Sequence, residues 1–151
     1  MRALATALFV LVAACAGSTA TSTASPVGTA EPSPVAKRSG QLDAQVPMPT
    51  GFPGDVPVYT KARLTAGAAF RSDGQVSWGM EWQTLDAVEQ VRVFYAQRLS
   101  QGDWSITFGT APSGTFTATF TRKSNAQVQG ILSSSRANGV TKISMSLAAP
   151  T

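Results

Sequence analysis

Few side chains in this sequence could carry out chemistry. The 151 residues include no histidine and a single cysteine, Cys15. Without imidazole there is no Ser-His or Cys-His nucleophile and no histidine ligand for a metal ion. A single thiol forms neither an intramolecular disulfide nor a cysteine cluster for zinc or iron–sulfur. We therefore expect a protein without a metal ion or cofactor, and one that is not an enzyme.

The carboxylates have structural interpretations. Asp73 lies in a predicted turn, Asp86 and Glu89 are placed to cap a helix, and Asp55 and Asp103 lie in connecting segments. None of them forms an evident pair for acid–base catalysis. Phosphate-binding glycine motifs and the S-x-x-K motif are absent from the sequence.

The charge of +4 is spread thinly. The longest basic runs, Lys37-Arg38 and Arg122-Lys123, have two residues each. A nucleic-acid-binding surface usually carries a denser basic stripe. We therefore expect no nucleic-acid partner.

The first residues have the pattern of an export signal. One basic residue, Arg2, precedes an uncharged apolar run over residues 3–14. As a helix this run would reach about 18 Å, which is too short for the ~30 Å hydrocarbon core of a membrane. Residues 1–14 are therefore predicted to be a cleaved signal peptide.

The end of this run, Val12-Ala13-Ala14-Cys15, resembles the lipobox of bacterial lipoproteins. The resemblance implies cleavage before Cys15 and lipid on its sulfur. The protein would then be anchored by this lipid to the outer, extracytoplasmic face of the cell membrane. Two or more acyl chains anchor a protein stably, whereas one does not. The alternatives are ordinary secretion with a free Cys15 and an uncleaved start.

A linker separates this start from a folded domain. In residues 16–40, 20 of 25 positions are Ala, Gly, Ser, Thr or Pro. Such a composition buries too little apolar surface to offset the entropy of the chain. We assign residues 15–46 to the lipidated cysteine and a disordered tether, and residues 47–151 to a single domain.

The domain is predicted to be α+β, an antiparallel sheet of about six strands with one helix packed on one face. The element order is β-β-α-β-β-β-β, after a Pro-rich lead-in that Phe52, Val56, Val58 and Tyr59 would anchor. Asp-Gly at 73–74 and Asn-Gly at 138–139 are typical of hairpin turns. Alternating hydrophobicity and helical periodicity predict the elements. The expected strands are residues 62–70, 76–82, 103–108, 115–122, 127–134 and 140–147, with a helix from Asp86 to before Gly102.

The parity of the strands predicts two unlike faces. One face would carry the large apolar side chains under the helix. In the first strand, Ala62, Leu64, Ala66, Ala68 and Phe70 alternate. In later strands the face includes Trp78, Met80, Trp82, Trp104, Ile106, Phe108, Phe116 and Phe120. The other face is polar and nearly uncharged, and it includes Ser105, Thr107, Thr115, Thr117, Thr119, Thr121, Gln127 and Gln129.

Two binding sites are conceivable on these faces. Trp78, Trp82, Tyr95 and Trp104 would line a ligand pocket under the helix, although inward-facing aromatic residues are more often plain core. The polar face is either an ordinary solvated surface or a contact surface for a glycan or a protein.

Three blocks of residues resemble motifs of uncharacterised bacterial envelope proteins, many of them lipoproteins. Those motifs read roughly FPxDVPxYxxA, VxxFYxxxL and GW. Here Asp103 separates Gly102 from Trp104. The resemblance implies architecture and location, but no activity. The blocks are Phe52-Pro53-x-Asp55-Val56-Pro57-Val58-Tyr59-x-x-Ala62, Asp86-x-x-Glu89-x-Val91-x-x-Phe94-Tyr95-x-x-x-Leu99 and Gly102-Asp103-Trp104.

The sequence therefore favours a membrane-anchored envelope lipoprotein whose domain binds a protein or cell-wall partner without catalysis. The alternative is a carrier that holds a small apolar or glycan ligand in the Trp-lined pocket. An apolar cavity above about 300 Å³ would favour the carrier. A filled core with exposed apolar residues on the outer face or the lead-in would favour the binding module.

Overall fold

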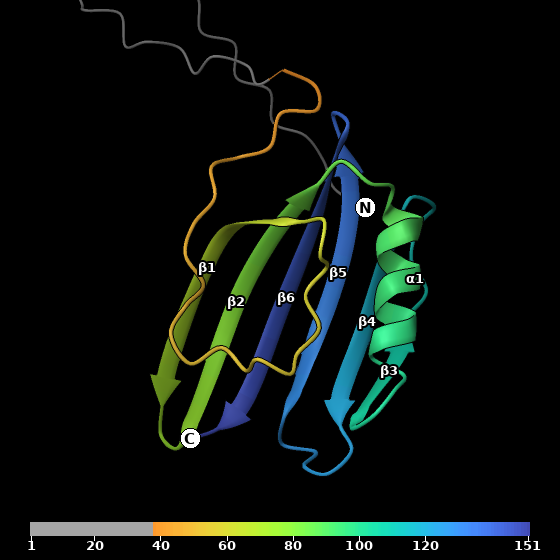
Figure 1. The fold of residues 1–151 in the computed structure, drawn as a ribbon. Helices are drawn as coiled ribbons and strands as arrows, with labels where there is room; N and C mark the ends of the chain where they lie inside the picture. The colour runs from red at the N-terminus through yellow and green to blue at the C-terminus, as the bar shows by residue number, and fades with distance from the viewer. Residues whose placement is uncertain (1–37) are drawn as a thin grey trace, which may run out of the picture. The chain divides into compact units, whose positions relative to one another are not determined.

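The computed structural model describes residues 38–151. The predicted signal peptide, Cys15 and the tether up to residue 37 lie outside these residues. One antiparallel six-stranded sheet and one helix form an α+β fold, as predicted (Figure 1). The strands lie side by side in the order β1-β2-β6-β5-β4-β3. The elements are β1 (Arg63–Ser72), β2 (Gln75–Thr84), α1 (Val88–Arg98), β3 (Trp104–Phe108), β4 (Thr115–Arg122), β5 (Gln129–Ala137) and β6 (Val140–Pro150).

Two tight turns set the register of the sheet. Asp73 and Gly74 have φ values of 32° and 80°, and Asn138 and Gly139 have 49° and 78°. Positive φ at both central residues is the geometry of a two-residue hairpin. These turns pair β1 with β2 and β5 with β6, as predicted. The last strand, β6, then lies between β2 and β5 and joins the two hairpins into one sheet.

The core lies on one side of the sheet, which we call the inner face. The predicted parity is confirmed, because Trp78, Met80 and Trp82 are buried there, and so are Trp104, Phe116 and Phe120, while Ile106 and Phe108 are partly buried. The lead-in lies in front of β1, β2 and β6 in Figure 1. The cluster also includes side chains of helix α1 and of the lead-in, namely Val88, Val91, Tyr95, Leu99, Val56 and Tyr59.

The predicted alternation along β1 is wrong beyond Leu64. The register shifts between Leu64 and Ala66, so that Thr65 is an extra residue in the strand. Leu64 remains buried opposite Trp82, but Ala66, Ala68 and Phe70 point to the opposite side of the sheet and are exposed. A bulge of one residue exchanges the faces of all residues that follow it, because side chains alternate with a period of two.

The helix begins one residue later than Asp86 would place it. Ala87 is the N-cap, and its backbone N–H donates to Gln90 Oε1 at 2.9 Å. The predicted capping role of Asp86 is therefore wrong. Its carboxylate instead accepts a hydrogen bond of 2.6 Å from the Tyr59 hydroxyl. After the helix, Gly102 has a φ of 61° in the turn that leads into β3.

Two boundaries also differ from the predicted ones. Gln127 lies in the turn before β5 rather than in a strand, because its N–H donates to Asn125 Oδ1 at 3.0 Å. Residues 38–46, which we assigned to the tether, are hydrogen-bonded to the domain. Gly40 N–H donates to the Asn138 carbonyl at 2.8 Å, and Val46 N–H donates to the Leu64 carbonyl at 2.9 Å. This part of the chain therefore belongs with the folded domain.

Candidate functional site

The four aromatic residues predicted to line a pocket lie in the core. Trp78, Trp82, Tyr95 and Trp104 are 4%, 1%, 0% and 5% exposed. Phe52 packs edge-on against both Trp78 and Trp82, with ring centroids 6.2 and 6.3 Å apart. The three cavities described below are lined by other residues. The position beside β2 where we predicted a ligand pocket is thus filled by the Phe52 ring of the lead-in.

The other side of the sheet, which we call the open face, is the larger candidate site. It is built from the alternate residues of all six strands that point away from the core, and most of them are exposed. Small hydroxyl-bearing side chains, Ala and Gly predominate. Its members are Ala66, Ala68, Phe70, Ser77, Gly79, Glu81, Lys142, Ser144, Ser146, Ala148, Gln129, Ile131, Ser133, Ser135, Thr115, Thr117, Thr119, Thr121, Ser105 and Thr107.

Charge on the open face is confined to one end. Glu81 and Lys142 form an ion pair of 2.9 Å across β2 and β6. Beside them, Arg63 donates to the Asp43 carbonyl at 3.0 Å. The remaining members are uncharged, so the centre of the face presents hydroxyl and methyl groups from neighbouring strands. Hydroxyl groups of this kind can donate and accept hydrogen bonds, and methyl groups can make van der Waals contacts.

Two large apolar side chains interrupt this polar surface. Phe70 on β1 is 66% exposed and Ile131 on β5 is 55% exposed. Ile131 borders a shallow hollow of about 330 Å³ over β4, β5 and β6. The hollow exists because the neighbouring side chains are small, including Ser146 and Ala148 on β6. The Ile131 side chain and this hollow give the centre of the open face its exposed apolar area.

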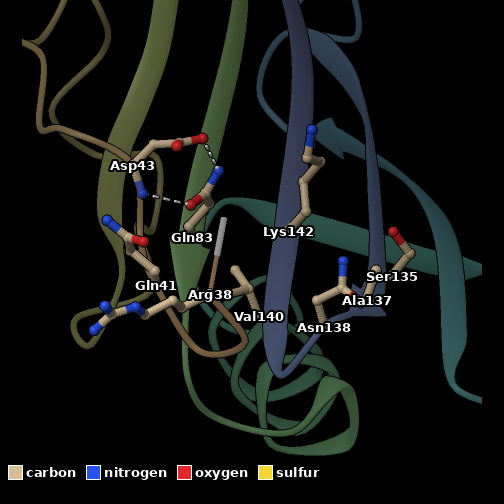
Figure 2. A pocket seen from close by; sticks show the side chains of 9 residues that line it. All are labelled: Arg38, Gln41, Asp43, Gln83, Ser135, Ala137, Asn138, Val140 and Lys142. Carbon is tan, nitrogen blue, oxygen red and sulfur yellow. Dashed lines mark hydrogen bonds between the residues drawn. The ribbon is translucent and has the colours of Figure 1, made fainter. Parts of the chain in front are cut away.

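A second hollow, of about 200 Å³, lies at the end of the open face beside the β5–β6 turn (Figure 2). Residues 38–43 form one of its walls. Figure 2 shows that Asp43 and Gln83 are joined twice, because Asp43 N–H donates to Gln83 Oε1 at 2.9 Å and Gln83 Nε2 donates to Asp43 Oδ2 at 2.7 Å. Arg38 and Lys142 add positive charge to this hollow.

The third hollow, of about 400 Å³, lies between the lead-in and the end of α1. Asp55 belongs to its lining and forms an ion pair of 2.6 Å with Arg122. The Arg122 guanidinium in turn lies 4.8 Å from the centre of the Trp104 ring. These contacts explain the acidic residue of the lead-in as a structural one, since it joins the lead-in to the end of β4.

The Tyr59 hydroxyl, which donates a hydrogen bond to the Asp86 carboxylate, has a raised pKa. Burial and the adjacent Asp86 carboxylate raise the pKa of Tyr59 to about 12. Lys61 Nζ lies 3.7 Å from the same carboxylate, and Thr141 Oγ1 donates to the Asp86 carbonyl at 2.6 Å. Sequence reasoning missed this network because Tyr59, Lys61 and Thr141 are 25 to 55 positions from Asp86 in the chain. The network fixes the loop before α1 to the lead-in and to β6.

Within residues 38–151, no group of three or more His, Cys, Asp or Glu residues is arranged to hold a metal ion. In the same part of the chain, no helix has the length and apolar character needed to cross a membrane. Comparison of the chain with protein families, with curated proteins and with solved structures gave no match. The resemblances to a lipobox and to the envelope-protein motifs therefore stay predictions.

Proposed function

We propose that this chain is a bacterial envelope lipoprotein, anchored through lipid on Cys15 to the outer face of the cell membrane. Its domain would be a non-catalytic binding module for a protein or cell-wall partner. The observation that carries this proposal is the open face. It is a six-stranded surface with little charge, and Phe70 and Ile131 expose apolar area on it.

In this proposal the inner face of the sheet forms the core, and the open face binds the partner. Within residues 38–151, helix α1 and the lead-in contribute side chains to the core on the inner face, and most residues of the open face are exposed. An antiparallel sheet commonly keeps one solvated face. What distinguishes this one is the pair of exposed large apolar residues, together with the hollow beside Ile131.

The carrier function has less support. A carrier needs space beside Trp78, Trp82, Tyr95 and Trp104, and these side chains are buried in the core. Of the three hollows described above for residues 38–151, the two that exceed about 300 Å³ lie on the open face and at the lead-in. The binding module is therefore the function that we favour.

Anchoring is tested by the mass of the mature N-terminal peptide and by cell fractionation. We expect a peptide that begins at Cys15 and carries a diacylglyceryl group, in protein taken from the membrane fraction. Cys15→Ala should abolish this mass and release the protein, whereas the nearby Ser18→Ala should change neither. A mature Cys15 with a free thiol would refute the anchor and leave the binding module to be judged separately.

The binding module is tested with a photo-crosslinking amino acid at Ile131. The control position is Val93, an equally aliphatic residue on α1 that is 43% exposed. We expect one specific crosslinked partner from Ile131 in intact cell envelopes and none from Val93. Excess unlabelled protein should remove the crosslink, and excess Ile131→Lys protein should not. Equal crosslinking from both positions, or none from either, would show that the open face is an ordinary solvated surface.

A further inference from the structure

Among residues 38–151, several outward backbone groups on the β1 edge of the sheet receive no backbone hydrogen bond from another segment. Its opposite edge, β3, is only five residues long, whereas β1 has ten. From Ala66 to Ser72 every residue of β1 is exposed. Edge strands in soluble proteins are normally protected by charged side chains, proline, bulges or short length. In β1 the bulge at Thr65 lies at the N-terminal end, and the stretch from Ala66 to Phe70 has no charge and no proline.

The tight turn after β1 identifies the unpaired groups. In a two-residue hairpin the flanking residues, here Ser72 and Gln75, exchange both backbone hydrogen bonds. Backbone groups alternate in direction along a strand, so those of Phe70, Ala68 and Ala66 also point toward β2. The N–H and C=O groups of Gly67, Ala69 and Arg71 then point away from the sheet.

A contact at the start of the strand agrees with this assignment. The Leu64 carbonyl accepts from Val46 N–H at 2.9 Å, so it also points outward. Leu64 and Gly67 are three positions apart, which is the spacing expected when one bulge residue interrupts the alternation. Among residues 38–151, no backbone hydrogen bond from another segment reaches the outward groups of Gly67, Ala69 or Arg71.

We propose that β1 is a dimer edge, where a second copy of this chain adds its own β1 antiparallel across a twofold axis at Ala69. The outward triplet is symmetric about Ala69. Pairing therefore sets Ala69 against Ala69 and Gly67 against Arg71 of the second copy. Three residues per strand each offer one donor and one acceptor, which gives about six hydrogen bonds. The interface is isologous, as a twofold axis requires.

The side chains are self-complementary in this register. On the open side, Phe70 lies opposite Ala68 of the second copy, so that the 66% exposed ring covers a small residue. On the other side Arg71 lies opposite Gly67, whose inner side packs against Pro49 of the lead-in, so the arginine side chain lies over Pro49 and the two arginines do not face each other. Like charges directly opposite would be destabilising. This pairing of large with small residues from a single strand is what commits the edge to a second copy rather than to an unrelated peptide.

Disulfide trapping tests the register. Residues in a hydrogen-bonded antiparallel pair have Cα atoms about 5.5 Å apart, within the range that a disulfide spans. In the full chain with Cys15→Ala, an added Ala69→Cys thiol is the only one. We expect rapid formation of a covalent dimer in a mild thiol–disulfide buffer. The matched control, Thr107→Cys on the opposite edge strand β3, should stay monomeric under the same conditions.

A second variant tests the pairing without a covalent bond. Ala69→Pro removes an outward N–H at an edge position, where proline is tolerated within a sheet. One hydrogen bond is lost in each copy, so the dissociation constant measured by sedimentation should rise about tenfold. Its thermal unfolding should remain cooperative, which separates loss of pairing from loss of fold.

Three results would overturn the proposal. The first is equal trapping of Ala69→Cys and Thr107→Cys, which would mean random collision. The second is a monomer at all concentrations with no trapping at Ala69. The third is a segment of another protein bound along β1 in purified material, because the edge would then belong to a different partner.

Discussion

Substitution of Gly130 by alanine is the sharpest test of which side chains point into the core. Gly130 lies opposite Phe120 in the β4–β5 pair and faces the inner side. A Cβ atom at this position would lie 2.4 Å from Phe120 Cζ and 2.4 Å from the Ser146 carbonyl oxygen. The ring could rotate away, but the carbonyl belongs to the central strand β6 and moves only if the sheet moves.

The size of the effect follows from two opposed contributions. Forcing an extra methyl group into a packed core costs typically about 1–3 kcal/mol. Replacing glycine by alanine at a compatible backbone position gains about 0.4–1 kcal/mol through the unfolded state. Gly79→Ala on β2 is the matched control, because a Cβ there meets nothing within 4 Å. We expect Gly130→Ala to lower the free energy of unfolding by about 1–2 kcal/mol and Gly79→Ala to raise it slightly.

Urea unfolding followed by tryptophan fluorescence measures both variants. The m-value should be unchanged, so that the midpoint alone reports the loss. If Gly130→Ala were as stable as Gly79→Ala, the contact between Phe120 and Gly130 would be wrong. The assignment of inner and open faces on β5 would fail with it, since Ile131 is the next residue in the chain.

Three further predictions concern contacts between distant segments. Tyr59→Phe should lower stability by about 1–2 kcal/mol at neutral pH, because the hydrogen bond to Asp86 is lost. The pKa of Tyr59 is raised to about 12 in the folded state, so the stabilisation by the Tyr59 hydroxyl is present below pH 10 and is lost as the pH rises toward 12. In thermal melts at a series of pH values, the difference in stability between the wild type and Tyr59→Phe should therefore shrink over that range. Hydrogen bonds from Ser124 lower the pKa of Asp103 below its ordinary 3.8, so the stabilisation that Asp103→Asn removes should be present above that pH and should disappear as acid titrates the folded protein. Gly139→Ala should destabilise the β5–β6 turn by about 1–2 kcal/mol because φ is 78°, and hydrogen exchange at Gly40 should accelerate because the new Cβ would lie 3.2 Å from its nitrogen.

Periodicity in the sequence was a good guide where side chains differ strongly between the two faces. Along β2, large apolar residues alternate with Ser77, Gly79 and Glu81, and one register satisfies that pattern. The Asp-Gly and Asn-Gly turns were equally informative, since few residues adopt positive φ. The six strands and the helix could therefore be predicted.

Where side chains are small, hydrophobic periodicity does not show which residues point to which face of the sheet. Residues 65–69 of β1 read Thr-Ala-Gly-Ala-Ala, which gives both faces nearly the same hydropathy, so the bulge at Thr65 could not be located. The ordered segment 38–46 depends on individual hydrogen bonds, such as those between Asp43 and Gln83, which are 40 positions apart. No local pattern encodes such contacts.

The candidate site, too, could be predicted only in part from the sequence. Parity placed the threonines of β4 on the open face, but it also made the aromatic residues look like the walls of a pocket. Whether a buried aromatic face leaves a cavity depends on what lies against it. Here Phe52 packs against Trp78 and Trp82, and that contact follows from the path of the lead-in rather than from any spacing in the sequence.

Binding of a partner to the open face and pairing through the β1 edge use different surfaces, so both interactions can form at the same time. Pairing through β1 would add strands in the plane of the sheet and would leave Ile131 and its hollow exposed on both copies. Phe70 would then be explained by the dimer edge, and Ile131 alone would mark the surface for a further partner. A crosslink from Ile131 that persists in the Ala69→Pro variant would show that the two surfaces act separately. Loss of the crosslink would show that the partner recognises the paired sheets.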